Sequence, residues 1–372
     1  MSDAAPAPGV RPGNSPLWLR VRASGMRTVA VMGMTKNTGK TVALNHLLAQ
    51  AAADRVEVGL TSIGRDGEER DEVFSIPKPP VIVWPGMVVA TARDTLQRAR
   101  LRFKPLGPTG IDSPMGEILV VKALERGAME VAGASRGHDQ RKIIALLRQC
   151  GASLVLLDGA LGRSQHASPA IADGVVLATG AAIGGGMQDV IRKTRDRLAI
   201  LGLPAADAAT ASACAELFDA GGVGLWGRHG EALFRADIAS LNAGPKLLEH
   251  ADRDIATVAF TGAVGRSLWR VIERLAAAHR GLTVVVADGT RLFVDSTDLA
   301  SLARHGARLV AYRGIRIAGI TLNPFSPLGG HFAAPDFLEA ARAAFAEHEV
   351  TDVVWEQTTR DYVERTDGSI AA

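Results

Sequence analysis

The chain has 372 residues, and its 42 basic and 39 acidic side chains leave a formal net charge of only +3. Such a small imbalance, without a Lys/Arg block, gives little support for nucleic-acid binding. Cys150 and Cys214 are far apart in sequence, which argues against a zinc site or a disulfide framework. No apolar run reaches the ~18–20 residues of a membrane helix. We therefore expect a cytoplasmic protein that binds neither nucleic acid nor membrane.

The first 54 residues predict a tail followed by a strand and a helix. Residues 1–26 are rich in Pro, Gly and Ala near their start, and we expect a disordered tail there. A β-branched run at 28–32 predicts a strand that Gly33 ends. Apolar residues at helical spacing predict a helix from Gly39 to about Asp54. A second strand is predicted at 56–62, so this part reads as a βαβ unit with a parallel sheet.

The α/β alternation continues after an interruption. Prolines break residues 74–90 into short extended pieces, and residues 117–131 hold two more short strands, so we expect an antiparallel insertion. Helices are expected at 138–149 and 187–201. Further strands are expected at 153–157, 174–178, 257–260, 283–287, 317–322 and 352–355.

The segment GMTKNTGKT, residues Gly33–Thr41, has the chemistry of a phosphate-binding loop. It follows a predicted strand and opens a predicted helix, where backbone N–H groups make a concave anion site. Gly39 permits close approach of the backbone to phosphate, Lys40 can reach the β/γ-phosphates, and the Thr41 hydroxyl can ligate Mg²⁺. The usual first glycine of such loops is displaced, because Met34 stands at that position and Gly33 lies one residue earlier. A chance Gly-Lys-Thr at an ordinary strand–helix turn is the alternative.

Carboxylates elsewhere in the chain could complete the site. Asp158 ends an apolar strand, so we expect its carboxylate at the carboxyl edge of the sheet, beside the loop, as a catalytic and Mg²⁺-binding group. Asp66 and Glu68 lie in the charged loop 63–71, and we assign Asp66 the same two roles. The alternatives are a helix-capping role for Asp158 and a merely solvated acidic loop for Asp66 and Glu68.

These predictions together give an α/β P-loop NTPase. We expect a mainly parallel sheet flanked by helices, a small antiparallel insertion and a C-terminal α/β half. The P-loop domain should span 27–205, a junction 206–256 and the C-terminal α/β part 257–372.

The loop resembles those of one class of P-loop proteins. The spacing Gly-x5-Gly-Lys-Thr is similar to that of dethiobiotin synthetase, and Lys-Asn-Thr-Gly-Lys-Thr is similar to the P-loop protein of molybdopterin-guanine-dinucleotide synthesis. In dethiobiotin synthetase-like proteins, an Asn at a strand end followed by Pro can read the adenine edge, which Asn323 of this chain matches. A turn-forming role is the alternative for Asn323. The chain has no Asn/Thr-Lys-x-Asp guanine signature, which favours ATP over GTP.

Within this class, the chain resembles the P-loop subunit of lysine 5,6-aminomutase reactivase. The resemblance covers most of the chain after the tail and rests on four segments: GMTKNTGKTVALN, GLTSIGRDGEERD, LLDGALGRSQHASPAIADGVVLATGAA and ITLNPFSP. It implies ATP-driven reactivation of an adenosylcobalamin-dependent aminomutase together with a second ATPase subunit.

The resemblance also carries residue assignments. It implies nucleotide contacts from Gly33, Lys36, Asn37, Gly39, Lys40 and Thr41, to which we add the neighbouring Thr38 and Val42. It strengthens Asp66 and Asp158 as Mg²⁺ ligands. Lys36 could act across the interface of a homo-oligomer, as an extra loop lysine does in some members of the class, or could simply be exposed.

We therefore predict an ATP-binding, ATP-hydrolysing reactivase or chaperone subunit. An ATP-dependent ligase of the dethiobiotin synthetase kind and a non-hydrolysing ATP-binding interaction subunit are the alternatives.

Overall fold

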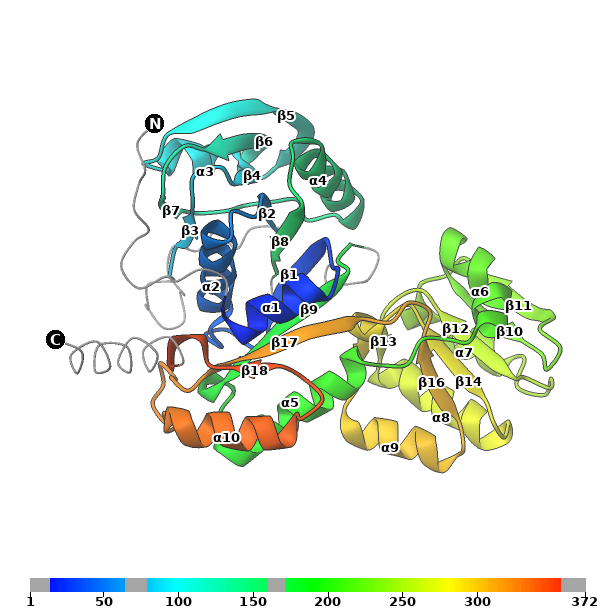
Figure 1. Cartoon of the computed structure of the whole chain (residues 1–372). Coiled ribbons are helices and arrows are strands. Elements are labelled where there is room, and N and C mark those ends of the chain that lie inside the picture. Colours follow the sequence, from blue (N-terminus) through cyan, green and yellow to red (C-terminus); the bar gives the residue numbers. More distant parts are fainter. Residues whose placement is uncertain (1–13, 64–78, 160–170, 356–372) are drawn as a thin grey trace. The chain divides into compact units, whose positions relative to one another are not determined.

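The computed structural model describes residues 14–63, 79–159 and 171–355 (Figure 1). These residues form two compact units. Of the described residues, those up to Arg195 and again from Ile317 belong to the first unit, and residues 196–316 belong to the second. The second unit is thus inserted, along the sequence, into the first.

The first unit is built on a nine-stranded mixed sheet with the strand order β18-β17-β9-β1-β8-β2-β4-β6-β5. Its strands are β1 (Thr28–Gly33), β2 (Val58–Ser62), β4 (Val88–Ala92), β5 (Phe103–Ser113), β6 (Gly116–Ala123), β8 (Leu154–Asp158), β9 (Gly174–Gly180), β17 (Arg316–Asn323) and β18 (Val350–Thr351). A separate two-stranded sheet pairs β3 (Val81–Val83) with β7 (Gly127–Met129). The helices are α1 (Pro16–Ala23), α2 (Lys40–Ala53), α3 (Arg93–Arg98), α4 (Gly137–Gln149) and α10 (Ala334–Ala344), and α5 (Met187–Leu201) begins in this unit and ends in the second.

Strand β1 lies at the point where the strand order reverses. It pairs in parallel with β8 on one side and with β9 on the other, and β2 lies beyond β8. The carboxyl ends of parallel strands on the two sides of such a point enclose a crevice in which α/β proteins bind ligands. The loop that follows β1 therefore starts at the binding edge of the sheet.

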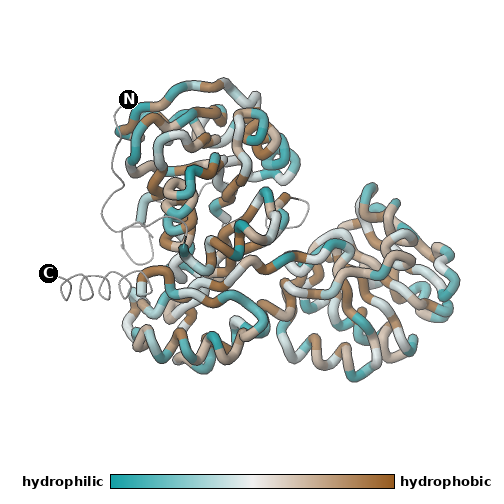
Figure 2. Tube along the Cα trace, in the orientation of Figure 1, coloured by the Kyte–Doolittle hydropathy of each residue, from teal (hydrophilic) through white to brown (hydrophobic). Residues whose placement is uncertain are grey.

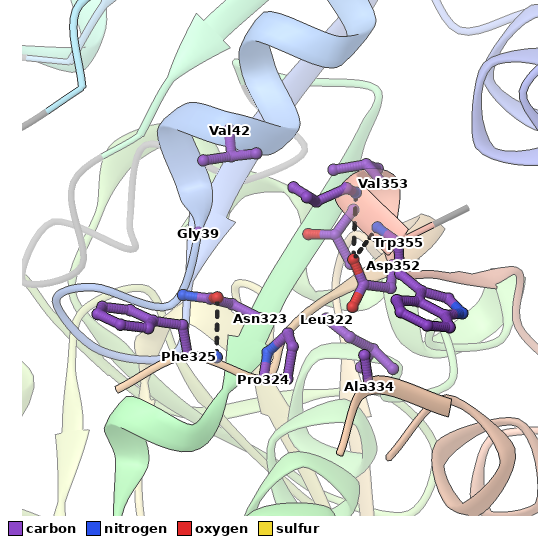
Figure 3. Close-up of a pocket in the computed structure, with 12 residues that line it drawn as sticks. Gly39, Val42, Leu322, Asn323, Pro324, Phe325, Ala334, Asp352, Val353 and Trp355 are labelled. Atoms are coloured by element: carbon purple, nitrogen blue, oxygen red, sulfur yellow. Dashed lines mark hydrogen bonds between the residues drawn. The ribbon is translucent and has the colours of Figure 1, made fainter. Parts of the chain in front are cut away.

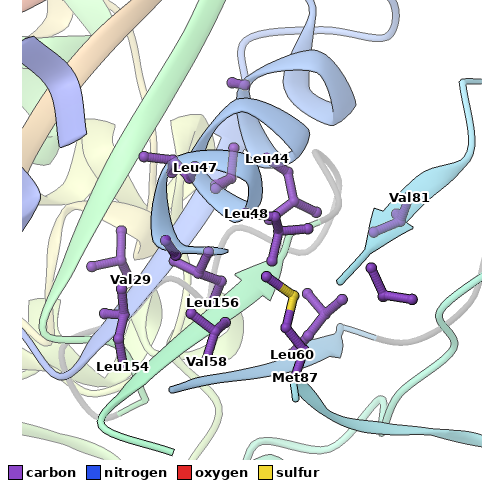
Figure 4. Packing of buried hydrophobic residues seen from close by; sticks show 14 of the residues in the cluster. Val29, Leu44, Leu47, Leu48, Val58, Leu60, Val81, Met87, Leu154 and Leu156 are labelled. Carbon is purple, nitrogen blue, oxygen red and sulfur yellow. The ribbon is translucent and has the colours of Figure 1, made fainter. Parts of the chain in front are cut away.

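The hydrophobic core of the first unit explains why these elements pack as they do. Leu44, Leu47 and Leu48 recur at helical spacing on α2 and are fully buried against the sheet (Figure 4). On β2, Val58 and Leu60 belong to the same cluster as these leucines, whereas the intervening Gly59 faces the opposite way. A Cβ atom at Gly59 would lie 3.1 Å from Leu147 Cβ of α4. Helices α2 and α4 thus cover opposite faces of the sheet. In Figure 2 the central strands are mainly brown, which marks hydrophobic residues, whereas the helices carry both hydrophobic (brown) and hydrophilic (teal) residues.

The antiparallel insertion predicted from the prolines is present. Strand β6 pairs antiparallel with β4 and with β5, and β3 pairs antiparallel with β7. The edge strand β5 contains Pro105 and Pro108, and its register to β6 shifts after each of them. Proline removes a ladder N–H and bulges twist an edge, so this edge is a poor template for pairing with another chain.

The second unit has its own sheet and core. Its elements are α6 (Ala208–Ala220), β10 (Val223–Trp226), β11 (Ala232–Ala236), α7 (Gly244–Leu248), β12 (Thr257–Phe260), β13 (Val264–Gly265), α8 (Arg266–Ala278), β14 (Thr283–Val286), β15 (Leu292–Phe293), α9 (Ser296–Arg304) and β16 (Arg308–Ala311). The five-stranded sheet has the order β11-β10-β12-β14-β16, with β12, β14 and β16 parallel. Leu268, Ile272 and Leu275 form the buried face of α8 in a core that is distinct from that of the first unit.

These observations confirm the α/β class and the mainly parallel sheet, and they correct several boundaries. The predicted tail 1–26 contains α1, where Leu17 and Trp18 are fully buried and Trp18 Nε1 donates to Asp54 Oδ2 at 2.7 Å. The predicted junction 206–256 is folded, because it supplies α6, β10, β11 and α7 to the second unit.

The C-terminal segment also differs from the prediction. Residues from Ile317 onward belong to the first unit rather than to a C-terminal α/β half. The last strand is β18 at Val350–Thr351 instead of 352–355, because the Asp352 side chain accepts the N–H groups of Val354 and Trp355 and caps a helical turn. Among the residues that the structure describes, none of the helices has both the length and the apolar character needed to cross a bilayer.

Candidate functional site

The loop after β1 is held in shape by its own backbone and by β9. Met34 N donates to Ala178 O at 2.8 Å, which anchors the start of the loop on the neighbouring strand. The Thr38 hydroxyl donates to Thr35 O at 2.9 Å, which closes the loop on itself. A Cβ atom at Gly33 would lie 2.8 Å from Thr38 Oγ1, so the displaced glycine of the motif occupies a position where a side chain would force the loop to shift.

Two residues of the loop have left-handed backbone conformations. Gly39 has φ +86° and Asn37 has φ +62°. Glycine adopts this conformation without strain, and Asn tolerates it better than most residues. Gly39 caps the 14-residue helix α2, whose first intrahelical hydrogen bond runs from Ala43 N to Gly39 O. The N–H groups of the first turn therefore point out of the helix end, where they and the helix dipole favour an anion.

Lys40 and Asp158 meet at the carboxyl edge of the sheet. Lys40 Nζ lies 3.1 Å from Asp158 Oδ1 and donates to Gly159 O at 2.6 Å. Asp158 is only 5 % exposed and stands level with Val31 of β1 and Ser62 of β2 in the parallel ladders. The prediction that this carboxylate lies beside the loop is confirmed by these contacts. The arrangement places one cation and one carboxylate next to the N-terminus of α2.

The fit of Mg²⁺ depends on Thr41 and Asp158. Thr41 lies in the first turn of α2 and is 6 % exposed. Hydroxyl and carboxylate oxygens are suitable Mg²⁺ ligands, and Mg²⁺ in nucleotide sites takes few protein ligands because phosphate oxygens and water complete its shell. The described residues contain no cluster of three or more His, Cys, Asp or Glu that could hold a metal by themselves. The residues present thus fit Mg²⁺ bound together with phosphates. The other predicted ligand, Asp66, lies outside the described residues, as does Glu68.

Asn323 braces the loop. It ends β17, and its Nδ2 donates to Asn37 O at 2.8 Å, while its Oδ1 accepts from Phe325 N at 3.2 Å. A Cβ atom at Gly39 would lie 3.1 Å from Asn323 Cβ, and one at Gly180 would overlap the Asn323 carbonyl oxygen. The end of β17 therefore packs directly against the loop.

Comparison with protein-family models, with curated proteins and with solved structures gave no match.

A cavity of about 340 Å³ opens beside the loop (Figure 3). Its lining residues come from the start of α2, the end of β17, the start of α10 and the segment after β18: Gly39, Val42, Thr321, Leu322, Asn323, Pro324, Phe325, Ala334, Asp352, Val353, Val354 and Trp355. The cavity therefore brings together three of the predicted contacts, Gly39, Val42 and Asn323, and a segment after β18 that lies some 300 residues after the loop in sequence.

Sequence reasoning found Asn323 but missed Asp352, another polar group of this cavity. Asp352 is 2 % exposed, and its Oδ1 accepts from Val354 N at 3.1 Å and from Trp355 N at 3.0 Å. Burial raises the pKa of the Asp352 carboxyl above its ordinary value, and the two backbone hydrogen bonds oppose this in part. The sequence signal that could have indicated Asp352 as a site residue is its position directly after the strand Val350–Thr351. The remaining predicted contact, Lys36, is exposed on the loop.

Proposed function

We propose that this chain binds ATP with Mg²⁺ on the loop Gly33–Thr41 and hydrolyses it. The observation that carries the proposal is the contact of Lys40 Nζ with Asp158 Oδ1 at 3.1 Å, at the N-terminus of α2 and the carboxyl edge of the sheet. A cation, a carboxylate and free helix N–H groups at one place are the parts that P-loop proteins use to hold the β- and γ-phosphates.

Each residue has a role in this proposal. Lys40 exchanges its contact with Asp158 for the phosphate oxygens, which releases the Asp158 carboxylate. Thr41 and Asp158 are the oxygen ligands that would hold Mg²⁺, and the metal would neutralise charge on the phosphates. Asn323 keeps Asn37, and with it the loop, in the conformation that points backbone N–H groups at the phosphates.

We further propose that the chain works as a reactivase or chaperone subunit for an adenosylcobalamin-dependent aminomutase, together with a second ATPase subunit. The segments that resemble the reactivase family support this part of the proposal. The loop also suits an ATP-dependent ligase or a subunit that binds ATP without hydrolysing it, so the experiment must separate all three.

The test is phosphate release from Mg²⁺-ATP by the full-length chain, alone, with the second subunit, and with an aminomutase inactivated by cyanocobalamin. We expect release that the partners stimulate, together with recovered mutase activity. Tight ATP binding without release in any mixture would favour the binding subunit, and release that requires a small carboxylate acceptor would favour the ligase.

Lys40→Ala is the site variant, and Lys104→Ala, on the exposed part of β5, is the matched control. We expect loss of ATP binding and turnover in the first variant and wild-type behaviour in the second. Unchanged ATP affinity in Lys40→Ala would refute the assignment of the site.

A further inference from the structure

The cavity beside the loop has walls that suit a planar, partly apolar ligand. Val42, Leu322, Pro324, Val353 and Trp355 line it with carbon atoms and one indole. Small-molecule sites are typically cavities of this kind, with a few polar groups that fix the orientation of the ligand. Because Gly39 and Val42 flank Lys40 and Thr41 on the same turn, a nucleotide with its phosphates on the loop has its base within reach of the cavity.

Thr321 is a buried polar group that lacks a partner within the protein. Its residue is 2 % exposed and lines the cavity, and among the described residues its Oγ1 has no hydrogen-bond partner. A buried hydroxyl without a partner lowers stability, so such groups usually serve a ligand or a water. A hydroxyl can donate and accept, and among the described residues neither capacity of the Thr321 hydroxyl is used.

Asp352 is the second polar group of the cavity with an unused hydrogen-bonding atom. Both backbone N–H groups that reach it bind the same oxygen, Oδ1. Within the described part of the chain, no ion pair involves Asp352 and no hydrogen bond reaches its Oδ2. A carboxylate accepts hydrogen bonds only, so this oxygen calls for an N–H or O–H donor on the ligand.

The backbone positions of the two residues lie close together in the fold. In the parallel ladder of β17 and β18, Thr321 stands opposite Thr351, and Asp352 is the next residue after Thr351. The strand spacing and rise place the Cα atoms of Thr321 and Asp352 about 6 Å apart. The third polar group of the cavity, Asn323, already uses its amide on Asn37 and its carbonyl on Phe325.

We propose that Asp352 and Thr321 select the base of the bound nucleotide, and that this base is adenine. The inference rests on the proposed ATP site. The 6-amino group of adenine donates to Asp352, and the neighbouring ring nitrogen N1 accepts from the Thr321 hydroxyl. A 6-oxo purine presents an acceptor where the amino group would be, and it therefore faces the carboxylate with the wrong polarity.

The test measures the affinities of ATP, inosine triphosphate, GTP and inorganic tripolyphosphate by calorimetry, in the presence of Mg²⁺. For the wild-type chain we expect ATP to bind about tenfold or more tightly than inosine triphosphate. Asp352→Asn should remove most of this preference, because the amide can donate to a 6-oxo group. The change keeps the helical cap, since Asn caps helices as well as Asp.

Thr321→Val separates a ligand-binding role from a structural one. It removes the hydroxyl at nearly constant shape, so we expect a higher melting temperature without nucleotide and a several-fold weaker affinity for ATP. The matched control is Thr61→Val, because the Thr61 hydroxyl is also buried and lacks a partner among the described residues, but lies outside the cavity lining. The control should raise the melting temperature and leave the ATP affinity unchanged.

The outcomes distinguish the two proposals. Equal affinities for ATP and inosine triphosphate, tighter binding of GTP than of ATP, or an unchanged preference in Asp352→Asn would overturn the base selection while phosphate binding by the loop stands. If neither tripolyphosphate nor any nucleotide binds, the proposed ATP site fails, and the base selection fails with it.

Discussion

The contact between Lys40 and Asp158 makes a quantitative prediction about the protein without nucleotide. Lys40→Met keeps the apolar stem but leaves the Asp158 carboxylate, whose side chain is 6 % exposed, without its cation. Breaking a buried pair in this way costs about 3–5 kcal/mol. The Lys40 side chain is 21 % exposed, so we expect a smaller cost than this, about 2–3 kcal/mol of unfolding free energy.

Removing the carboxylate of Asp158 instead of the cation of Lys40 should cost less stability. In Asp158→Asn the ammonium group keeps its hydrogen bond to Gly159 O and its access to water, so the expected loss is about 1 kcal/mol. Lys40→Met/Asp158→Asn removes both charges and should be no less stable than Lys40→Met alone. The expected coupling free energy between the two sites is about 1–2 kcal/mol.

The assay is native-state amide hydrogen exchange of peptides that cover β1 and α2, without nucleotide or Mg²⁺. Exchange of these peptides reports on the first unit alone. A global unfolding measurement would mix the stabilities of the two units, because each unit has its own core. If Lys40→Met leaves the opening free energy unchanged, or if Asp158→Asn costs more than Lys40→Met, then the pair is not the buried contact described above.

Two further predictions concern the loop and the cysteines. Gly39→Ala places a side chain at φ +86° and 3.1 Å from Asn323, so we expect a loss of about 1–2 kcal/mol in stability and weaker ATP binding. The control Gly86→Ala, at φ +91° in open space, should lose stability but keep its ATP affinity. Equal ATP affinities in the two variants would contradict the close fit at Gly39. Cys150 is partly exposed, whereas Cys214 is buried and burial raises its pKa to about 11. A thiol reagent at pH 8 should therefore react with one cysteine in the native protein and with two after unfolding. Rapid reaction of Cys214 in the native protein would contradict its burial in the second unit.

The parts of the fold that the sequence predicted are those that local physics determines. The β-branched run at 28–32, the glycines of the loop and the helical spacing of Leu44 and Leu48 each restrict their own segment, and together they predict β1, the loop and α2. Asp158 was predictable for the same reason, since a polar residue at the end of an apolar strand marks the carboxyl edge of the sheet.

Long-range pairing determines the rest, and no local pattern reveals it. The apolar pattern of β17 does not indicate that this strand returns to the first sheet after the whole second unit, and only the resemblance that assigned Asn323 to the nucleotide pointed there. Helix α1 was missed because a short amphipathic helix after a Pro-rich start gains its stability from burying Leu17 and Trp18 against the first unit. Asp352 was missed because its position in the cavity depends on the pairing of β18 with β17.

The insertion of the second unit has a consequence for biosynthesis. The loop Gly33–Thr41 leaves the ribosome early, but the strand that braces it, β17, is translated only after residues 196–316. At roughly 5–20 residues per second, about 14–55 seconds separate the two. Residues 196–316 can complete their own core in that interval, while the nine-stranded sheet waits for its last two strands. A chain that ends just before residue 317 should therefore carry a folded second unit and a phosphate loop without its brace.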